Sequence, residues 1–485
     1  MTRFRTVLRV FISAWLFFAL GSGCGGAVTT TKPSAGSGPV NPDTPTALVF
    51  IDRGHGWGHK GEWDKAINEY DEAIRLNPSH AGAFTSRGHA WFQKKEYDRA
   101  IQDHDEAIRL DPTLAVAFIN RGFAHGTKGD WDKAIKDFDV VTRLDPKDPT
   151  AFGYRGTAHF NKGQLDEAIK DQSQAVRLDP NNSEAFTNRG NAWARKKEFD
   201  KAITDYDAAI RIDPNHARAF SYRGYAWLQK NENGKALKDC NEAIRLDPTL
   251  AVGFNNRGNV WDRLREHDKA IHDYDAALRL DPNSAVTFIN RGFVLSRRNE
   301  FDKAIKDFDE AIRLDQTQAI AFAARGCAWS RKADYDTAVK DCDEAIRLDP
   351  TLAGAFDYRA SVYALKGEWE KAIKDYDEAI RLDPSLATAF QGRAWVQATC
   401  PVGKFRNGDK AVVDGKRACE LNGWVIPVDL EVLAAGFAEK GEFDEAIRWQ
   451  KKALDDADYA KSTGEVARER LKLYEAKKPF RYGEK

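Results

Sequence analysis

Hydrophobic and small residues recur along this chain with the spacing of two alternating helices. In residues 81–94 the apolar face of the first helix comprises Ala83, Phe84, Gly88, Ala90 and Trp91. In residues 98–110 the apolar face of the second helix comprises Ala100, Ile101, Ala107, Ile108 and Leu110. Because residues three and four apart lie on one side of a helix, the pattern predicts two amphipathic helices joined by a polar turn.

Polar residues predict where the second helix begins and ends. Asp98 stands where an N-cap residue belongs, so its side chain is expected to accept hydrogen bonds from the first free amides. Asp111-Pro112 is expected to end the helix, because proline cannot continue a helix and disfavours a helical residue before it. Residues 81–114 therefore predict one helical hairpin.

The same hairpin recurs at a fixed step of 34 residues. The Asp-Pro pair keeps this step, with prolines at Pro112, Pro146, Pro180, Pro214, Pro248, Pro282, Pro350 and Pro384. An Arg-Gly pair also keeps it, with glycines at Gly54, Gly88, Gly122, Gly156, Gly190, Gly224, Gly258, Gly292 and Gly326. A period held without drift predicts stacked copies of one unit, so we expect an all-α solenoid rather than one globular core.

Some positions within the unit carry further expectations, counting Ala81 as position 1. Glycine at position 8 costs about 1 kcal/mol inside a helix, so we expect it to allow close helix approach, with the alanine of position 20 opposite, as in Ala100. Asn233-Gly234 replaces the usual aromatic-Asp pair, and Gln316 replaces a proline. These two places predict softer joints.

The unit resembles the tetratricopeptide repeat (TPR). In residues 353–386 the residues that match its pattern are Phe356, Tyr363, Ala372, Tyr376, Ala379 and Pro384, with Ala360 in place of the glycine. The resemblance implies a right-handed superhelix of helical hairpins whose first helices line a concave groove. It covers ten regular units over 47–386 and two divergent units over 387–456, the first with an insertion at about 400–408. Residues 457–485 are expected to form a capping helix and a tail.

The resemblance also implies which residues face the groove. Position 6 is mostly Asn or Tyr, and partly resembles the asparagine ladder of O-GlcNAc transferase TPR arrays, which grips the backbone of an extended peptide. An amide suits this role because it both donates and accepts hydrogen bonds. A packing role for the same residues is the open alternative. The candidate peptide-binding residues are Asn120, Tyr154, Asn188, Asn191, Tyr222, Asn255, Asn256, Asn259, Asn290 and Tyr358.

Other polar residues predict no catalytic or metal site. His55, His59 and His89 have metal-compatible spacing, but no acidic or cysteine ligand completes the set. The chain carries no phosphate loop, HExxH motif or nucleophile elbow, so we expect no enzyme activity, metal or cofactor. Four arginines fall at position 13, where they suit either an acidic partner or the C-terminus of the first helix, which we favour: Arg195, Arg263, Arg297 and Arg331.

The N-terminus resembles a bacterial lipoprotein signal. A basic segment with three arginines precedes an apolar run at 10–20, which is too short to span a bilayer, and Gly21-Ser22-Gly23-Cys24 follows. The resemblance implies lipidation of Cys24, with simple signal cleavage or an uncleaved anchor as alternatives. Residues 1–24 would then form the signal, and residues 25–46, rich in Gly, Ser, Thr and Pro, a disordered tether.

Charge and cysteine content narrow the list of partners. Lys plus Arg equals Asp plus Glu, 74 each, so no overall field attracts nucleic acid. Six cysteines do not form a disulfide framework in so long a chain, although Cys327 and Cys342 lie on the two helices of one hairpin and could form a bridge. We therefore expect a scaffold of the cell envelope or periplasm that binds protein or peptide segments and is anchored to the membrane through Cys24. The alternative is an accessory subunit that organises envelope biosynthetic enzymes or recognises glycan.

Overall fold

The computed structural model describes residues 46–483, and in this range the chain contains helices and turns but no strand. The all-α arrangement of paired helices confirms the predicted fold class. The chain divides after Asn256 into two compact units, which are described separately below. Residues 1–45, with the predicted signal, Cys24 and most of the predicted tether, lie outside the described range.

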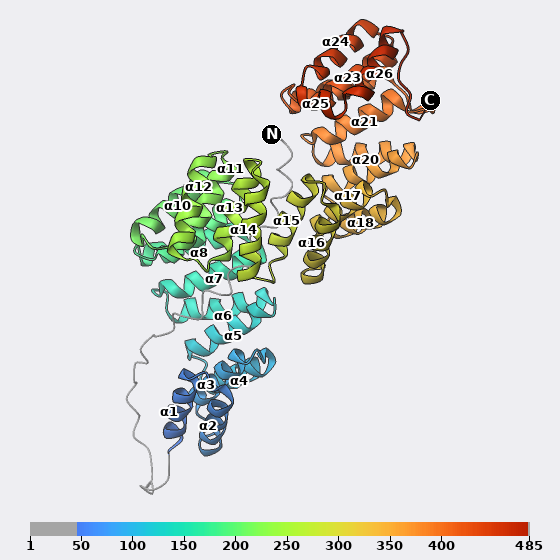
Figure 1. The fold of residues 1–485 in the computed structure, drawn as a ribbon. Helices are drawn as coiled ribbons and strands as arrows, with labels where there is room; N and C mark the ends of the chain where they lie inside the picture. Colours follow the sequence, from blue (N-terminus) through green and yellow to red (C-terminus); the bar gives the residue numbers. More distant parts are fainter. Residues whose placement is uncertain (1–45, 484–485) are drawn as a thin grey trace. The chain divides into compact units, whose positions relative to one another are not determined.

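The helices follow one another as hairpins, and Figure 1 shows the two members of hairpins such as α1–α2 and α3–α4 side by side. The first helices are α1 (Ala47–His59), α3 (Ala81–Gln93), α5 (Ala115–Thr127), α7 (Pro149–Lys162), α9 (Ser183–Arg195), α11 (Ala217–Gln229), α13 (Ala251–Arg263), α15 (Ala285–Arg297), α17 (Ala319–Arg331), α19 (Ala353–Leu365), α21 (Ala387–Thr399) and α23 (Pro427–Lys440). The second helices are α2 (Trp63–Leu76), α4 (Tyr97–Leu110), α6 (Trp131–Leu144), α8 (Leu165–Leu178), α10 (Phe199–Ile212), α12 (Asn233–Leu246), α14 (His267–Leu280), α16 (Phe301–Leu314), α18 (Tyr335–Leu348), α20 (Trp369–Leu382), α22 (Gly408–Leu421) and α24 (Phe443–Leu454). The short α25 (Ala457–Ser462) and α26 (Gly464–Glu475) follow.

The position-8 glycines do allow close helix approach, but mainly to a residue other than the predicted alanine. A Cβ added at Gly292 would lie 2.6 Å from Cε1 of Phe308, the aromatic residue at position 24 of the same hairpin. The position-20 alanine comes nearest at Gly326, where a Cβ would lie 2.9 Å from the carbonyl oxygen of Ala338 and 3.0 Å from the sulfur of Cys342. Where position 24 is aromatic, glycine thus makes room for a buried ring of the same hairpin.

The ends of α4 show that the N-cap predicted at Asp98 was wrong, and they add detail to the helix end predicted at Asp111-Pro112. The N-cap of α4 is Glu96, whose side chain makes no capping bond, and Asp98 lies inside the first turn. At the other end, the carboxylate of Asp111 accepts hydrogen bonds from the backbone N–H and the hydroxyl of Thr113, which lowers the pKa of Asp111. The same turn forms at Asp315, although Gln316 replaces the proline. The aspartate therefore forms this turn without the proline, and the softness of either predicted joint stays a prediction.

Beyond residue 387 the hairpins become irregular. A 3-10 turn at Gly403–Phe405 occupies the predicted insertion between α21 and α22. α26 packs against α24, and the tail returns to α21, where the backbone N–H of Tyr482 donates to the carbonyl of Thr399 (2.8 Å). The guanidinium of Arg470 lies over the rings of both Trp395 (4.9 Å) and Phe480 (4.7 Å). The C-terminal segment is thus held by specific contacts.

Candidate functional site

A line of arginines at position 7, which we call the arginine ladder, connects successive hairpins. Arg291 donates from Nε and Nη2 to both carboxylate oxygens of Asp307 in its own hairpin (2.8 and 2.7 Å). Its Nη1 donates to Asp275 in the preceding hairpin (2.5 Å), and the guanidinium lies 5.6 Å from the ring centre of Phe288. The arginines that bond two carboxylates in this way are Arg87, Arg121, Arg155, Arg223, Arg291, Arg325, Arg359 and Arg393.

The arginine ladder is structural rather than a free basic surface. The side chain of Arg291 is 22% exposed and that of Asp307 only 8%. Hydrogen bonds to Asp307 raise the pKa of Arg291 above its already high value. Bidentate pairing of this kind fixes orientation as well as charge. The Arg-Gly step was recognised in the sequence, but the pairing of its arginines was not predicted. Aspartates at positions 23 and 25 keep the same period in most units, and this pattern could have indicated the pairing.

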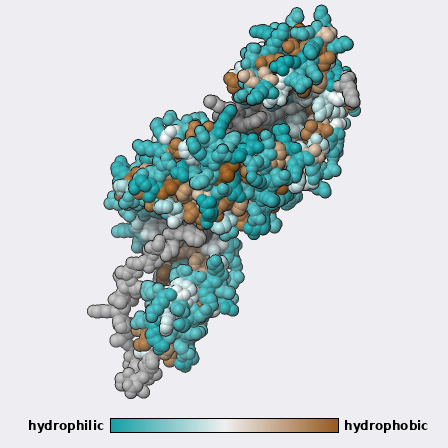
Figure 2. All heavy atoms as spheres, viewed as in Figure 1, coloured by the Kyte–Doolittle hydropathy of each residue, from teal (hydrophilic) through white to brown (hydrophobic). Residues whose placement is uncertain are grey.

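A second line of ion pairs explains the position of Asp98. Its carboxylate pairs with the ammonium of Lys128 in the next hairpin, and Lys162 pairs in the same way with Asp132 (2.5 Å). These groups are solvent-exposed, so each pair contributes little to stability. On the face drawn in Figure 2, hydrophobic residues are scattered among hydrophilic ones. Such charged positions form the solvated part of the surface.

Four of the predicted groove residues form what we call the groove row: Asn120, Tyr154, Asn188 and Tyr222. They occupy the same position on α5, α7, α9 and α11 and are all partly exposed. The side chains of Asn120 and Asn188 make no hydrogen bond with another described residue. Tyr154 packs edge-on against Phe123, with ring centres 4.9 Å apart. The groove row therefore alternates unbonded amides with tyrosine rings.

Two of the remaining predicted residues in the unit that ends at Asn256 form hydrogen bonds within the protein. Asn191 accepts a hydrogen bond from the hydroxyl of Tyr206 (2.8 Å). Asn256 donates from Nδ2 to the carbonyl oxygen (3.1 Å) and hydroxyl (3.0 Å) of Ser221 in the preceding first helix. Asn255 is also buried. These bonds support the packing alternative at Asn191 and Asn256, and a ligand role for the three residues stays a prediction.

The unit that begins at residue 257 contains the other three predicted residues. Asn259 accepts a hydrogen bond from the hydroxyl of Tyr274 (2.8 Å), as Asn191 does from Tyr206. Asn290 is buried and Tyr358 is partly exposed. Their ligand role also stays a prediction.

The arginines at position 13 do not share one environment. Arg195 donates from Nη1 to the carbonyl of Phe160 in the last turn of α7 (3.0 Å), and burial lowers its pKa. Arg297 pairs with Asp262 (2.5 Å), whereas Arg331 is exposed. The Arg195 contact supports the interpretation that a cation stabilises a helix C-terminus.

The other candidate residues from the sequence are histidines and cysteines. His55 lies 3.1 Å from the hydroxyl of Ser86, and burial lowers its pKa. Within residues 46–483, no cluster of three or more His, Cys, Asp or Glu side chains could hold a metal ion. Cys327 and Cys342 form no disulfide bond, so the bridge that the sequence left open is absent from the described residues. In the same range, no helix is long and apolar enough to cross a membrane.

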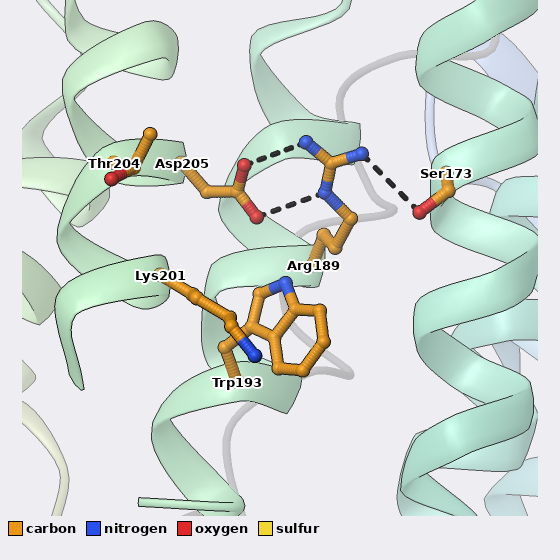
Figure 3. Close-up of a pocket in the computed structure, with 6 residues that line it drawn as sticks. All are labelled: Ser173, Arg189, Trp193, Lys201, Thr204 and Asp205. Atoms are coloured by element: carbon orange, nitrogen blue, oxygen red, sulfur yellow. Dashed lines mark hydrogen bonds and ion pairs between the residues drawn. The ribbon is translucent and has the colours of Figure 1, made fainter. Parts of the chain in front are cut away.

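A pocket of about 280 Å³ between α8, α9 and α10 was not predicted from the sequence (Figure 3). The pocket is lined by Ser173, Arg189, Trp193, Lys201, Thr204 and Asp205. Arg189 and Trp193 lie one turn apart on α9, about 100° and about 140° around the helix axis from Asn188, and Asn188 does not line the pocket. The pocket is therefore separate from the groove row.

Comparison with protein-family models identifies the repeat. Segments 183–216 and 251–284 match a model described as tetratricopeptide repeat, and 60–115 and 290–353 match a second model with that description. Segments 156–197 and 360–398 match a model described as TPR repeat. Together these segments span just over half of the chain.

Solved structures show a similar arrangement of helices. The human IFIT1 dimer with m7Gppp-AAAA is 15% identical, the match covers 77% of this chain and 90% of that chain, and the TM-score is 0.51. Yeast Tom70 is 19% identical over 89% of this chain and 95% of that chain, with a TM-score of 0.41. A tetratricopeptide repeat protein from Parabacteroides merdae is 16% identical over 51% of this chain and 98% of that chain, with a TM-score of 0.47.

The search of curated proteins gave no match. Family membership therefore rests on the family models and on the helical hairpins, which agree in period and in register. The chain belongs to the tetratricopeptide repeat family, whose members are generally non-catalytic scaffolds for protein–protein binding.

Proposed function

We propose that this protein is a scaffold that binds an extended peptide segment along the groove row. The observation that carries the proposal is the pair of unbonded amides at Asn120 and Asn188, which occupy the same position on α5 and α9. Both amides are partly exposed, so a ligand can reach them, and a peptide backbone supplies both an acceptor for the amide N–H groups and a donor for the amide oxygen.

The tyrosines between these amides suit the same ligand. A tyrosine offers flat contact area and a hydrogen-bonding tip at low cost in side-chain entropy. Burial raises the pKa of Tyr222 to about 12, so its hydroxyl remains a donor at neutral pH. The ring of Tyr222 lies 6.2 Å from that of Tyr206, which supports its orientation. An extended chain crossing four first helices would meet amide and phenol groups in turn.

A site-specific crosslinker tests where the partner binds. Benzoylphenylalanine is placed at Asn188 in the full chain, expressed in its native cells, and a matched variant carries it at the exposed Lys170 of α8. We expect an adduct with a protein from position 188 and none from position 170, because only the first lies in the groove row. Equal adducts from both positions would contradict the proposal.

Alanine variants test the chemistry of the same site. Asn120→Ala with Asn188→Ala should weaken capture of the crosslinked partner by about tenfold or more, since each lost amide removes hydrogen bonds worth about 1 kcal/mol each. The control pair Lys136→Ala with Lys170→Ala should not, and circular dichroism should show equal helicity. Capture of glycan instead of protein would favour the accessory-subunit alternative.

We further propose that the protein is exported to the cell envelope or periplasm and anchored to the membrane by lipid on Cys24. The support is the sequence of the N-terminus alone: a basic segment, a short apolar run and Gly21-Ser22-Gly23-Cys24. Labelled palmitate should be incorporated by the wild-type chain and not by Cys24→Ser. Label that survives this substitution, or no label on the wild type, would refute the anchor.

A further inference from the structure

The arginine ladder is interrupted at Arg189. Arg87, Arg121, Arg155 and Arg223 each bond an aspartate of their own hairpin and one of the preceding hairpin. Arg189 keeps its own partner, Asp205, at 2.9 and 2.7 Å. In place of the second carboxylate, its Nη1 meets the hydroxyl of Ser173 at 3.2 Å (Figure 3). Arg189 is thus bonded to one carboxylate, whereas Arg155 and Arg223 are each bonded to two.

The pocket at this interruption gathers hydrogen-bond donors, among them the cations of Arg189 and Lys201, which pair with Asp205 and Glu198. The ammonium of Lys201 lies 4.5 Å from the ring centre of Trp193, and Figure 3 shows its side chain crossing the indole. The Trp193 indole N–H makes no hydrogen bond with another described residue. Asp205, with a side chain 6% exposed, is the one carboxylate in the lining, and Glu198 lies 3.5 Å from Lys201 at the rim. A ligand in this pocket would meet hydrogen-bond donors from α8, α9 and α10.

The next hairpin shows what fills the same place. Arg223, Trp227 and Lys235 repeat the arrangement, with Lys235 4.4 Å from the ring centre of Trp227. There Asp207 stands where Ser173 stands, and accepts a hydrogen bond from Arg223 Nη1 at 2.5 Å. The chain itself therefore shows that a carboxylate fits this position of the arginine ladder.

We propose that the pocket lined by Ser173, Arg189, Trp193 and Lys201 binds a carboxylate of an acidic peptide segment. The carboxylate takes the place that Asp207 occupies in the next hairpin and accepts from Arg189 Nη1 and the Ser173 hydroxyl. Lys201 supplies a second positive charge, and the methylene groups of a Glu side chain pack on Trp193. A volume of about 280 Å³ accommodates one or two side chains but not a folded domain.

A labelled oligoglutamate peptide with an amidated C-terminus tests this site by fluorescence anisotropy with the full chain. The wild type should bind it saturably, and more weakly as salt is added. Ser173→Asp restores the arginine ladder with the protein's own carboxylate and should weaken binding about tenfold or more, since charge-assisted hydrogen bonds are lost. No saturable binding by the wild type, or equal binding by the variant, would overturn the proposal.

A matched variant makes the opposite change. Asp207→Ser should create a second site at Arg223 and raise the number of peptides bound from one to two. Both variants should fold, because each makes one hairpin like its neighbour; equal melting temperatures would verify this. A stoichiometry that stays at one would count against the role given to Ser173.

Two further measurements separate this site from other sources of binding. An oligoalanine peptide with a free C-terminus distinguishes a terminal carboxylate from a side-chain one, and competition by inorganic phosphate at equal concentration would overturn specificity for carboxylates. Ser173→Asp should leave the crosslink from residue 188 unchanged. The proposal for the pocket and the proposal for the groove row can therefore be refuted independently.

Discussion

The regular hairpins α1–α20 and the C-terminal region α23–α26 carry different residue types at position 7 of the repeat. In most of the regular hairpins, position 7 is an arginine bonded to aspartates of two hairpins, as Arg291 is. In α23 the corresponding residue is Leu433, which is fully buried in a cluster with Val412, Phe437 and Tyr474. The regular hairpins are thus joined by directed polar bonds, and the end of the array by an apolar core.

The transition between the two lies at Arg393. It bonds Asp414, 21 residues later instead of 16, and also Asp377 of the preceding hairpin. The inserted 3-10 turn extends the chain between α21 and α22 without moving the aspartate away from its arginine. The arginine ladder is therefore defined by spatial position rather than by spacing in the sequence.

The largest expected effect comes from removing an arginine of the ladder. Arg291→Ala would leave Asp307 buried without its cation, which costs about 3–5 kcal/mol. Leu433→Ala should cost about 2–5 kcal/mol by leaving a cavity, but hydrogen exchange should rise only around α22–α24. For Arg291→Ala, exchange should rise in both α14 and α16, because the arginine bonds both. The exposed Arg331→Ala is the control, with a change within about 0.5 kcal/mol.

Gly392→Ala probes the boundary between the two regions. A Cβ at Gly392 would lie 2.4 Å from Cζ of the buried Tyr376, so denaturant unfolding should show a loss of up to about 3 kcal/mol from overpacking. Gly354→Ala meets no atom within 4 Å and should be neutral or slightly stabilising. Equal effects of the two substitutions would mean that the ring of Tyr376 moves aside.

Acid should weaken the regular hairpins through His104, whereas residues 387–485 contain no histidine. His104 is fully buried with neither ring nitrogen hydrogen-bonded, and burial lowers its pKa to about 3. The unfolded chain takes up the proton below about pH 6.5 and the folded chain does not, so stability is lost as pH falls from 6.5 towards 3.

At pH 5 the loss from His104 amounts to about 2 kcal/mol. His104→Phe should remove this part of the pH dependence, because six other hairpins carry Tyr or Phe there. Thermal unfolding between pH 7 and pH 5 measures it. An unchanged pH profile would contradict the assignment to His104.

The smallest expected effect concerns the turn between the two helices of a hairpin. Ala333 has a φ of 63°, in the left-handed region, and Gly367 occupies the same place in the next hairpin with a φ of 77°. Ala333→Gly should therefore stabilise by up to about 1 kcal/mol, and Gly367→Ala should destabilise by a similar amount. Gly441 has a φ of 87° in the hairpin α23–α24, so Gly441→Ala extends the comparison to the C-terminal region.

The helices and their pairing could be predicted from the sequence because apolar spacing and a fixed period act locally. The N-cap at Asp98 was predicted wrongly because an aspartate that suits a cap can also pair with Lys128 in the next hairpin. The return of Tyr482 to Thr399 had no sequence signal, since it joins residues far apart in an irregular segment.

The candidate site could be predicted only as a set of positions. Position 6 was identified through the family resemblance, and Asn120 and Asn188 keep their amides unbonded there. The sequence could not show that Asn256 bonds Ser221, or that Asn191 bonds Tyr206, because those partners lie on other helices. The pocket at Ser173 exists where one aspartate of the arginine ladder is missing. Its proposed role came from comparing Ser173 with Asp207, which occupies the same position in the next hairpin.

The arginine ladder also bears on how such a chain can lengthen. Most regular hairpins carry one such arginine, one aspartate for it and one for the arginine of the next hairpin. A duplicated copy of such a hairpin inserted among its like would therefore find its partners already present. The array can gain or lose whole units without a compensating change elsewhere. The hairpin α23–α24 cannot be exchanged in this way. It carries Leu433 in place of the arginine and so cannot bond an aspartate of a preceding copy.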